Sequence, residues 1–184
     1  MVYMFLANGF EEIEALYTLD ILRRASVDVK TVAVTSDLPV GFAVGSHNIA
    51  VTCDITKDAL PLTDEFDMII LPGGMPGSIN LDNDPVVDKY INLALNGGKF
   101  ICAICAAPFI LGKRGILNGK RATCFPGFEK YLEGATVVDA GVVRDGNIIT
   151  GRAMGSAHEF ALTVLEALKG KESAEEMKKT IILK

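Results

Sequence analysis

The chain has 184 residues and a mass of 19.7 kDa, and 49% of its residues are hydrophobic. This length fits one domain, which we place over residues 1–184, and the composition excludes a disordered chain. The net charge of −5 argues against binding to nucleic acid. No apolar run approaches the length of a membrane span, about 20 residues, so we expect no membrane contact.

The first residues lack the basic stretch of a secretion signal, so we expect a cytoplasmic protein with free thiols. Cys102 and Cys105 have the spacing of a redox or zinc pair. Cys53 and Cys124 are isolated, however, and a zinc site would need a second close pair of ligands. We therefore expect neither a metal nor a cofactor.

Short apolar runs alternate with helical patterns along the chain. Strands are predicted at Val2 to Ala7, Val29 to Thr35, Asp67 to Leu71 and Lys99 to Ile104, and a hairpin at Phe42 to Val44 and Ile49 to Cys53. Helices are predicted at Glu11 to Ala25, Pro85 to Asn96, Ala106 to Lys113, Ser156 to Leu168 and Glu172 to Lys179. Shorter strands are predicted at Arg121 to Cys124, Val137 to Val138, Val142 to Val143 and Ile148 to Thr150.

This alternation predicts an α/β fold with a mostly parallel sheet and helices on both faces. Ligands in such folds bind at the carboxyl ends of the strands. The first helix is apolar on two sides, with Ala15 and Leu19 on one and Ile13 and Tyr17 on the other. The apolar side with Ile13 and Tyr17 indicates a homodimer through this helix. The alternative is that the predicted hairpin of the same chain buries this side.

Cys105 is the strongest candidate for chemistry, because it lies where a strand passes into a helix. That position lifts a side chain out of the sheet, and the helix dipole favours a thiolate there. The alternative is a small buried residue, the usual state of an unpaired cysteine. Cys102, within the strand, is expected in the core.

Two further features lie near strand ends. Gly73 and Gly74 follow a strand, and their backbone N–H groups can bind an oxyanion, although a simple tight turn is the alternative. Glu14 stands among apolar residues at the start of the first helix, where burial would raise its pKa. The alternative is that this carboxylate has no chemical role and only interacts favourably with the helix dipole.

Five segments together resemble the DJ-1/ThiJ/PfpI superfamily, most closely its deglycase branch and the bacterial ThiJ-like relatives. They are Gly9 to Glu14, Leu22 to Ala25, Leu71 to Gly74, Ala103 to Pro108 and Glu159 to Leu162. The resemblance covers nearly the whole chain. It implies a flavodoxin-like three-layer sandwich, commonly a homodimer through the first helix.

The resemblance also assigns roles. It places the reactive cysteine at Cys105 and a protonated glutamate at Glu14. It places oxyanion N–H donors at Gly74 and Ala106. It matches family arginines of an anion pocket to Arg24 and, less exactly, His47, and it matches Arg152 to an arginine near the dimer surface. The family histidine is replaced, since Phe125 stands before Pro126 and Ala106 follows the cysteine; His158 is a substitute only if its helix faces the site.

Three functions follow from this resemblance. The first is cysteine-dependent chemistry on small carbonyl compounds, of the glyoxalase or deglycase kind, weakened by Phe125. The second is redox sensing in oxidative stress, in which Cys105 is oxidised to a sulfinate. The third, thiazole monophosphate biosynthesis, is a label attached to ThiJ relatives, and no phosphate-binding motif supports it. The partners expected are therefore a small carbonyl compound or an oxidant.

Overall fold

The computed structural model describes residues 1–35 and 41–183, and it contains a seven-stranded sheet at its centre. The strand order is β10-β11-β7-β6-β1-β2-β5, and every pairing is parallel except that of β10 with β11. In this order the strands are β10 (Val142–Asp145), β11 (Ile148–Gly151), β7 (Phe100–Ile104), β6 (Met68–Leu71), β1 (Val2–Leu6), β2 (Val29–Ala33) and β5 (Ile55–Thr56). The predicted mostly parallel α/β sheet is confirmed.

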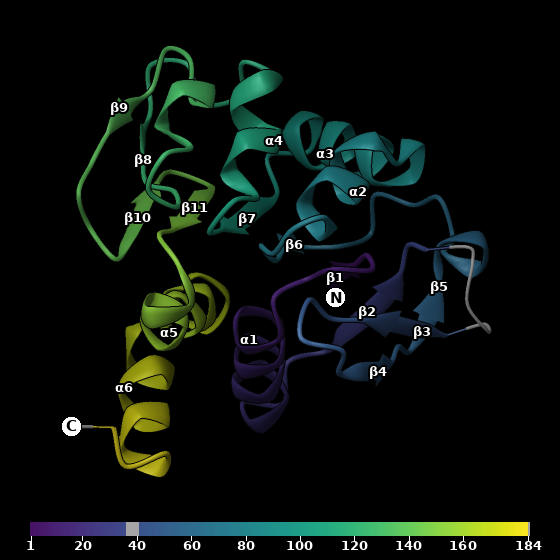
Figure 1. Cartoon of the computed structure of the whole chain (residues 1–184). Coiled ribbons are helices and arrows are strands. Elements are labelled where there is room, and N and C mark those ends of the chain that lie inside the picture. Colours follow the sequence, from purple (N-terminus) through teal and green to yellow (C-terminus); the bar gives the residue numbers. More distant parts are fainter. Residues whose placement is uncertain (36–40, 184) are drawn as a thin grey trace.

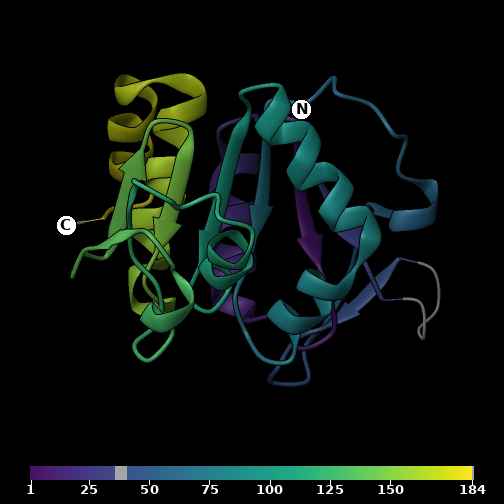
Figure 2. The ribbon, with the colours of Figure 1, turned by 90° about the horizontal axis from the view of Figure 1, so that it is seen from above.

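Helices cover both faces of the sheet, as Figures 1 and 2 show. One face carries α1 (Glu12–Arg24), α5 (Ala157–Lys169) and α6 (Lys171–Thr180). The other carries α2 (Gly77–Asn83), α3 (Pro85–Asn96) and α4 (Pro108–Lys113). This is the three-layer arrangement that alternating strands and helices predict.

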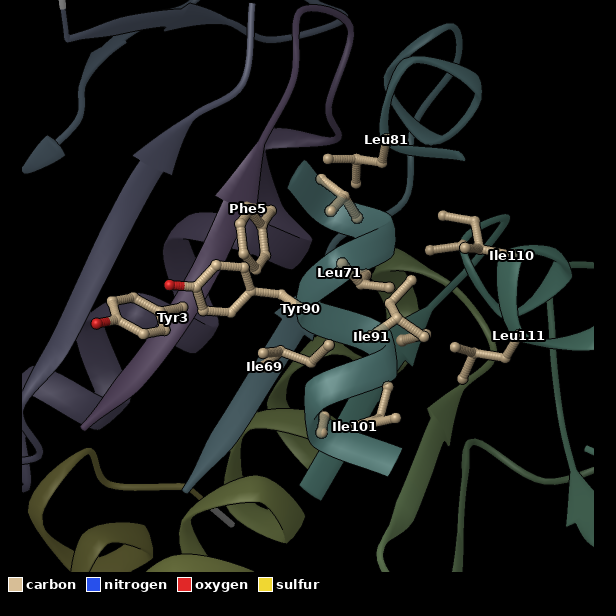
Figure 3. Close-up of a cluster of buried hydrophobic side chains, with 14 of the residues drawn as sticks. Tyr3, Phe5, Ile69, Leu71, Leu81, Tyr90, Ile91, Ile101, Ile110 and Leu111 are labelled. Atoms are coloured by element: carbon tan, nitrogen blue, oxygen red, sulfur yellow. The ribbon is translucent and has the colours of Figure 1, made fainter. Parts of the chain in front are cut away.

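The alternation of side chains along β1 divides the core between these two layers. Tyr3 and Phe5 point to the α3 side, whereas Met4 and Leu6 point to the α1 side. Tyr90 of α3 packs edge-on against Tyr3, with ring centroids 5.4 Å apart (Figure 3). Because β1 is buried on both faces, its sequence is a continuous apolar run rather than an alternating one.

Smaller elements complete the structure. The predicted hairpin is confirmed as β3 (Phe42–Val44) and β4 (Ala50–Thr52), and a separate parallel pair forms from β8 (Arg121–Ala122) and β9 (Thr136–Val137). Single turns of 3-10 helix are η1 (Lys57–Ala59), η2 (Glu129–Tyr131) and η3 (Met154–Ser156). None of the described helices is both long and apolar enough to cross a membrane.

The strand order brings the segments that follow three strands to the same edge of the sheet. Because β7, β6 and β1 are neighbours and parallel, the segments that follow Leu6, Leu71 and Ile104 leave the sheet at the same edge. The hairpin joins them, since the Gly9 N–H donates to the carbonyl oxygen of Val44 at 2.8 Å. Predicted site residues distant in sequence are therefore gathered at this edge.

Candidate active site

The backbone of Cys105 adopts a conformation that side-chain-bearing residues rarely use. Its φ is +65°, in the left-handed region, directly after β7. Its N–H donates to the Gly151 carbonyl oxygen at 2.9 Å, and its own carbonyl oxygen accepts from the Phe125 N–H at 2.8 Å. The turn is therefore held from two sides, and it presents a half-buried thiol in the manner of a nucleophile elbow.

Glu14 is held beside this turn by the first turn of α1. The Glu11 side chain caps the helix by accepting from the Glu14 N–H at 2.7 Å, and the Glu11 N–H donates to the Gly73 carbonyl oxygen at 2.9 Å. The Glu14 side chain is only 1% exposed, and its Oε2 accepts from the Gly73 N–H at 2.9 Å. The carboxyl group is thus fixed in position by two neighbouring chain segments.

Glu14 and Cys105 meet over the side-chain position of Gly73, and only a glycine fits there. A Cβ at this position would lie 2.4 Å from Glu14 Oε2 and 2.5 Å from the Cβ of Cys105. The absence of a side chain at Gly73 therefore allows the two groups to approach each other. Gly73 was predicted with Gly74 as an N–H donor to an oxyanion, whereas its N–H donates to Glu14.

Burial raises the pKa of Glu14 to about 7, and hydrogen bonding to the Cys105 thiol limits this rise. Glu14 Oε1 is fully buried and accepts no hydrogen bond from the described residues, so a proton on the carboxyl group avoids an unpaired buried charge. At neutral pH a large fraction of the carboxyl groups therefore carry a proton. The sequence-based expectation of a raised pKa at Glu14 agrees with this environment.

The helix dipole and free backbone N–H groups were expected to lower the pKa of Cys105, and this expectation is wrong. Burial and the nearby Glu14 carboxylate raise the pKa of this thiol, whereas the backbone N–H groups of Ala106 and Gly74 oppose the rise. The two acids therefore titrate as a coupled pair, because ionisation of one disfavours ionisation of the other. A thiolate at Cys105 is favoured only when Glu14 holds its proton.

The N–H groups predicted as oxyanion donors do face the sulfur. The backbone N–H groups of Gly74 and Ala106 both lower the pKa of the Cys105 thiol, because each can donate to the sulfur. Gly74 has a φ of +91°, and a Cβ there would lie 2.4 Å from the backbone nitrogen of Glu11. A glycine is therefore needed to turn this N–H toward the sulfur.

Arg24 and His47, predicted to bind an anion near the cysteine, occupy other surroundings. Arg24 pairs with Asp20 at 2.6 Å and lies at the far end of α1, ten helical residues and about 15 Å from Glu14. His47 donates its backbone N–H to Glu12 Oε1 at 2.6 Å, and its Nδ1 lies 2.7 Å from Glu12 Oε2. An anion-binding role for either residue stays a prediction.

Glu11, Glu12 and His47 also place one potential metal-ligand atom each within 4.8 Å of one another. The Glu12 carboxylate is only 3% exposed and already accepts three hydrogen bonds, from the His47 N–H, the His47 ring and the Ser46 hydroxyl. This carboxylate therefore acts first as the anchor of the β3–β4 turn to α1.

The remaining predicted positions divide between the site and the surface. Phe125 reaches the site through its backbone N–H, while its ring is 43% exposed. His158 is exposed on α5 beside Glu166 and Lys178, on a different part of the surface. Cys102 is fully buried, which confirms it as a core residue.

Arg152 is also not among the residues around the Cys105 thiol. It forms an ion pair with Asp139 and lines a separate hollow of about 320 Å³ together with Cys124 and Glu129. Its predicted place near a dimer surface stays a prediction.

Comparison with known proteins agrees with this geometry. The sequence profile of the DJ-1/PfpI family matches residues 1–167. Protein dj-1beta of Drosophila melanogaster is 38% identical over 181 residues, 97% of this chain and 94% of that protein. A glutathione-independent glyoxalase of Caenorhabditis elegans, DJR-1.2, is 36% identical over 176 residues, 94% and 90% of the two chains.

Solved structures show the same relationship. The crystal structure of a cysteine-to-alanine variant of a DJ-1 superfamily protein from Salmonella typhimurium superposes with a TM-score of 0.91. The two chains are 38% identical, and the match covers 98% of this chain and 97% of that one. The similarity therefore extends over nearly the whole chain.

Proposed function

Because the chain belongs to the DJ-1/PfpI family, we propose that Cys105 performs glyoxalase- or deglycase-like chemistry on small 2-oxoaldehydes. The observation that carries this proposal is the contact of the Cys105 thiol with a buried Glu14 carboxyl group and with two backbone N–H donors. A nucleophile, a proton carrier and an oxyanion site are the three parts that addition to a carbonyl group requires. The glyoxalase named among the relatives supports the same reaction class.

The reaction begins with addition of the Cys105 sulfur to the aldehyde carbon. A C–S bond forms, the carbonyl π electrons move to oxygen, and the N–H groups of Gly74 and Ala106 stabilise the negative oxygen until a proton from Glu14 reaches it. The product of this step is a hemithioacetal. No redox partner is consumed.

Glu14, now a carboxylate, next removes the proton from the former aldehyde carbon and returns a proton to the neighbouring ketone carbon through an enediol. The hemithioacetal thereby becomes a thioester of a 2-hydroxy acid. Water hydrolyses the thioester, which releases the hydroxy acid and restores the thiol. With methylglyoxal the sum is methylglyoxal plus water giving lactate.

We expect this activity to be weak, because Phe125 cannot carry a proton. A positioned general acid–base group contributes about 10²–10⁴ in rate, and Glu14 must serve every proton transfer by itself. The test is lactate formation from methylglyoxal by the purified protein, compared with Cys105→Ser and with Cys53→Ser as a control at a buried cysteine. Turnover that is lost only in Cys105→Ser supports the proposal, and equal rates in all three proteins contradict it.

A second function, redox sensing at Cys105, is favoured by the same donors. Peroxide oxidises the thiolate to a sulfenic acid and is reduced to hydroxide, and a second peroxide gives the sulfinic acid and water. The two N–H groups and a protonated Glu14 can each donate to the sulfinate oxygens. Peroxide treatment should add about 32 Da, two oxygen atoms, at Cys105 alone; an unmodified Cys105 would exclude this function.

We also propose that the chain forms a homodimer through α1. Ala15 and Leu19 are buried in the core, and Ile13 on the other side of the helix is 49% exposed. α5 packs beside α1. The hairpin, which was the predicted alternative cover for this side of the helix, leaves Ile13 exposed to solvent. Light scattering should give the mass of two chains for the wild type and of one for Ile13→Asp; a monomeric wild type contradicts the proposal.

A further inference from the structure

An apolar groove of about 250 Å³ lies between α2, α4 and η2. Its walls are formed by Met75, Ile79, Phe109, Lys113, Phe128 and Tyr131. Lys113 is the charged member of this set, and its ammonium group is paired with the Asp82 carboxylate. The lining therefore offers apolar surface rather than a free charge.

The wall of the groove is built from packed aromatic rings. The Phe128 ring lies 6.3 Å from that of Phe109 and 5.7 Å from that of Tyr131, measured between centroids. The Met75, Ile79 and Tyr131 side chains are between 40% and 45% exposed. Large apolar side chains that gather at the surface around a hollow are typical of a binding site, because exposing them to water costs free energy.

Two segments that line the groove directly follow, along the chain, the segments that hold the reactive thiol. Met75 directly follows Gly74, which donates its N–H to the Cys105 side chain. The Phe109 N–H donates to the carbonyl oxygen of Ala106, the other donor to the sulfur, at 3.0 Å. Met75 thus lies one residue beyond Gly74, and Phe109 lies three residues beyond Ala106.

Phe125 joins the same surface from a third direction. Its N–H binds the Cys105 carbonyl oxygen, and its ring meets that of Phe128 in a T-shaped contact with centroids 6.4 Å apart. The residue at the position of the family histidine therefore extends the aromatic wall toward the cysteine. It adds apolar surface where a proton carrier would otherwise stand.

We propose that this groove binds the apolar group of the substrate whose aldehyde carbon reacts at Cys105. This inference rests on the proposed function and specifies its substrates. The preferred 2-oxoaldehydes carry an aryl or a branched alkyl group rather than a methyl group. An aromatic substituent would pack against Phe109, Phe128 and Tyr131, whereas a methyl group is too short to contact them. A carboxylate-bearing substituent would be disfavoured, because Lys113 is already paired.

The test compares phenylglyoxal with methylglyoxal in steady-state kinetics. We expect a higher kcat/KM for phenylglyoxal, and we expect Ile79→Asn to reduce it by about tenfold through KM, the size typical of losing part of an apolar subsite. The same variant should leave methylglyoxal nearly unchanged. Ile49→Asn is the matched control, since Ile49 is 51% exposed and is not part of the groove lining. Equal effects of Ile79→Asn on both substrates would overturn the proposal.

A second measurement needs no turnover, so it separates the groove from the proposed reaction. The alkylation rate of Cys105 is measured by intact mass with iodoacetamide and with N-benzyl iodoacetamide, which differ by one aromatic group. We expect the benzyl reagent to react faster, and we expect Ile79→Asn to remove this preference. If neither aldehyde is turned over but the preference is found, the proposed reaction is contradicted and the proposed groove is supported. If the preference is absent, the proposed groove is contradicted.

Discussion

Replacing Glu14 with glutamine separates the two acids of the site while keeping the acceptor for the Gly73 N–H. In the wild type the pair releases its first proton near pH 7, so about half of the molecules carry one negative charge there. This charge lies on Glu14, and it raises the pKa of the neighbouring Cys105 thiol beyond the rise that burial causes. In Glu14→Gln only the thiol can ionise.

The size of the effect follows from the charge on Glu14. Burial continues to raise the pKa of Cys105 in the variant, but the Glu14 carboxylate no longer raises it further. At pH 7 about half of the wild-type molecules already lack this charge, so the alkylation rate of Cys105 with iodoacetamide should rise by about twofold at pH 7 and by more at higher pH. The rate is measured by intact mass against a Cys105→Ser blank.

The full pH profile makes this comparison decisive. The profile of Glu14→Gln should lie at lower pH than that of the wild type, because ionisation of Glu14 near pH 7 opposes ionisation of the thiol only in the wild type. Glu133→Gln, an isosteric change at an exposed glutamate, should follow the wild type. Identical profiles for wild type and Glu14→Gln would refute the coupling between the two acids.

Three further predictions concern the framework of the site. Gly73→Ala should slow Cys105 alkylation by about tenfold or more, because its Cβ would lie 2.4 Å from Glu14 Oε2 and 2.5 Å from Cys105 Cβ; an unchanged rate would show that the site tolerates displacement. The unfolding free energy should fall by about 3 kcal/mol between pH 4.5 and a pH above 7, because the unfolded chain releases the Glu14 proton in a range where the folded chain retains it. Urea unfolding of Glu14→Gln should lack this component, and an equal loss in both proteins would contradict it. Asp84→Ala should lower the unfolding free energy by about 1–2 kcal/mol, since the carboxylate caps α3 through the Val86 N–H at 2.8 Å; no change in the urea midpoint would contradict this role.

The sheet was predictable because its strands are buried on both faces. Runs such as Val2 to Ala7 and Met68 to Leu71 are too short for a helix and continuously apolar, which leaves a parallel strand as the explanation. α2 was missed because it begins with a glycine and contains polar residues without a helical stripe. β5 was missed because it has only two residues and depends on its neighbour β2 for hydrogen bonds.

The candidate site was predictable in its members but not in its electrostatics. The strand-to-helix position of Cys105 is local information, and the resemblance supplied Glu14 as its partner. The sequence could not show that the two groups meet over the side-chain position of Gly73, nor that the Gly73 N–H binds Glu14. For this reason the pKa of the thiol was expected to be low by itself, although it depends on the protonation of its neighbour.

The apolar groove was also hidden in the sequence. Phe109, Phe128 and Tyr131 come from two short elements separated along the chain, and their ring contacts depend on how η2 packs against α4. Phe125 was recognised from the sequence as the absence of a histidine. The structure shows it in addition as part of an aromatic wall beside the thiol.

Ultraviolet absorbance of the thiolate tests the central claim most directly, because it reports which atom carries the charge. The signal of Cys105 is the difference between wild type and Cys105→Ser during a pH titration. The account predicts that the thiolate signal develops above pH 7 in the wild type and moves to lower pH in Glu14→Gln, where no Glu14 charge opposes it. A Cys105 signal that develops only in strongly alkaline solution, at the same pH in both proteins, would contradict it.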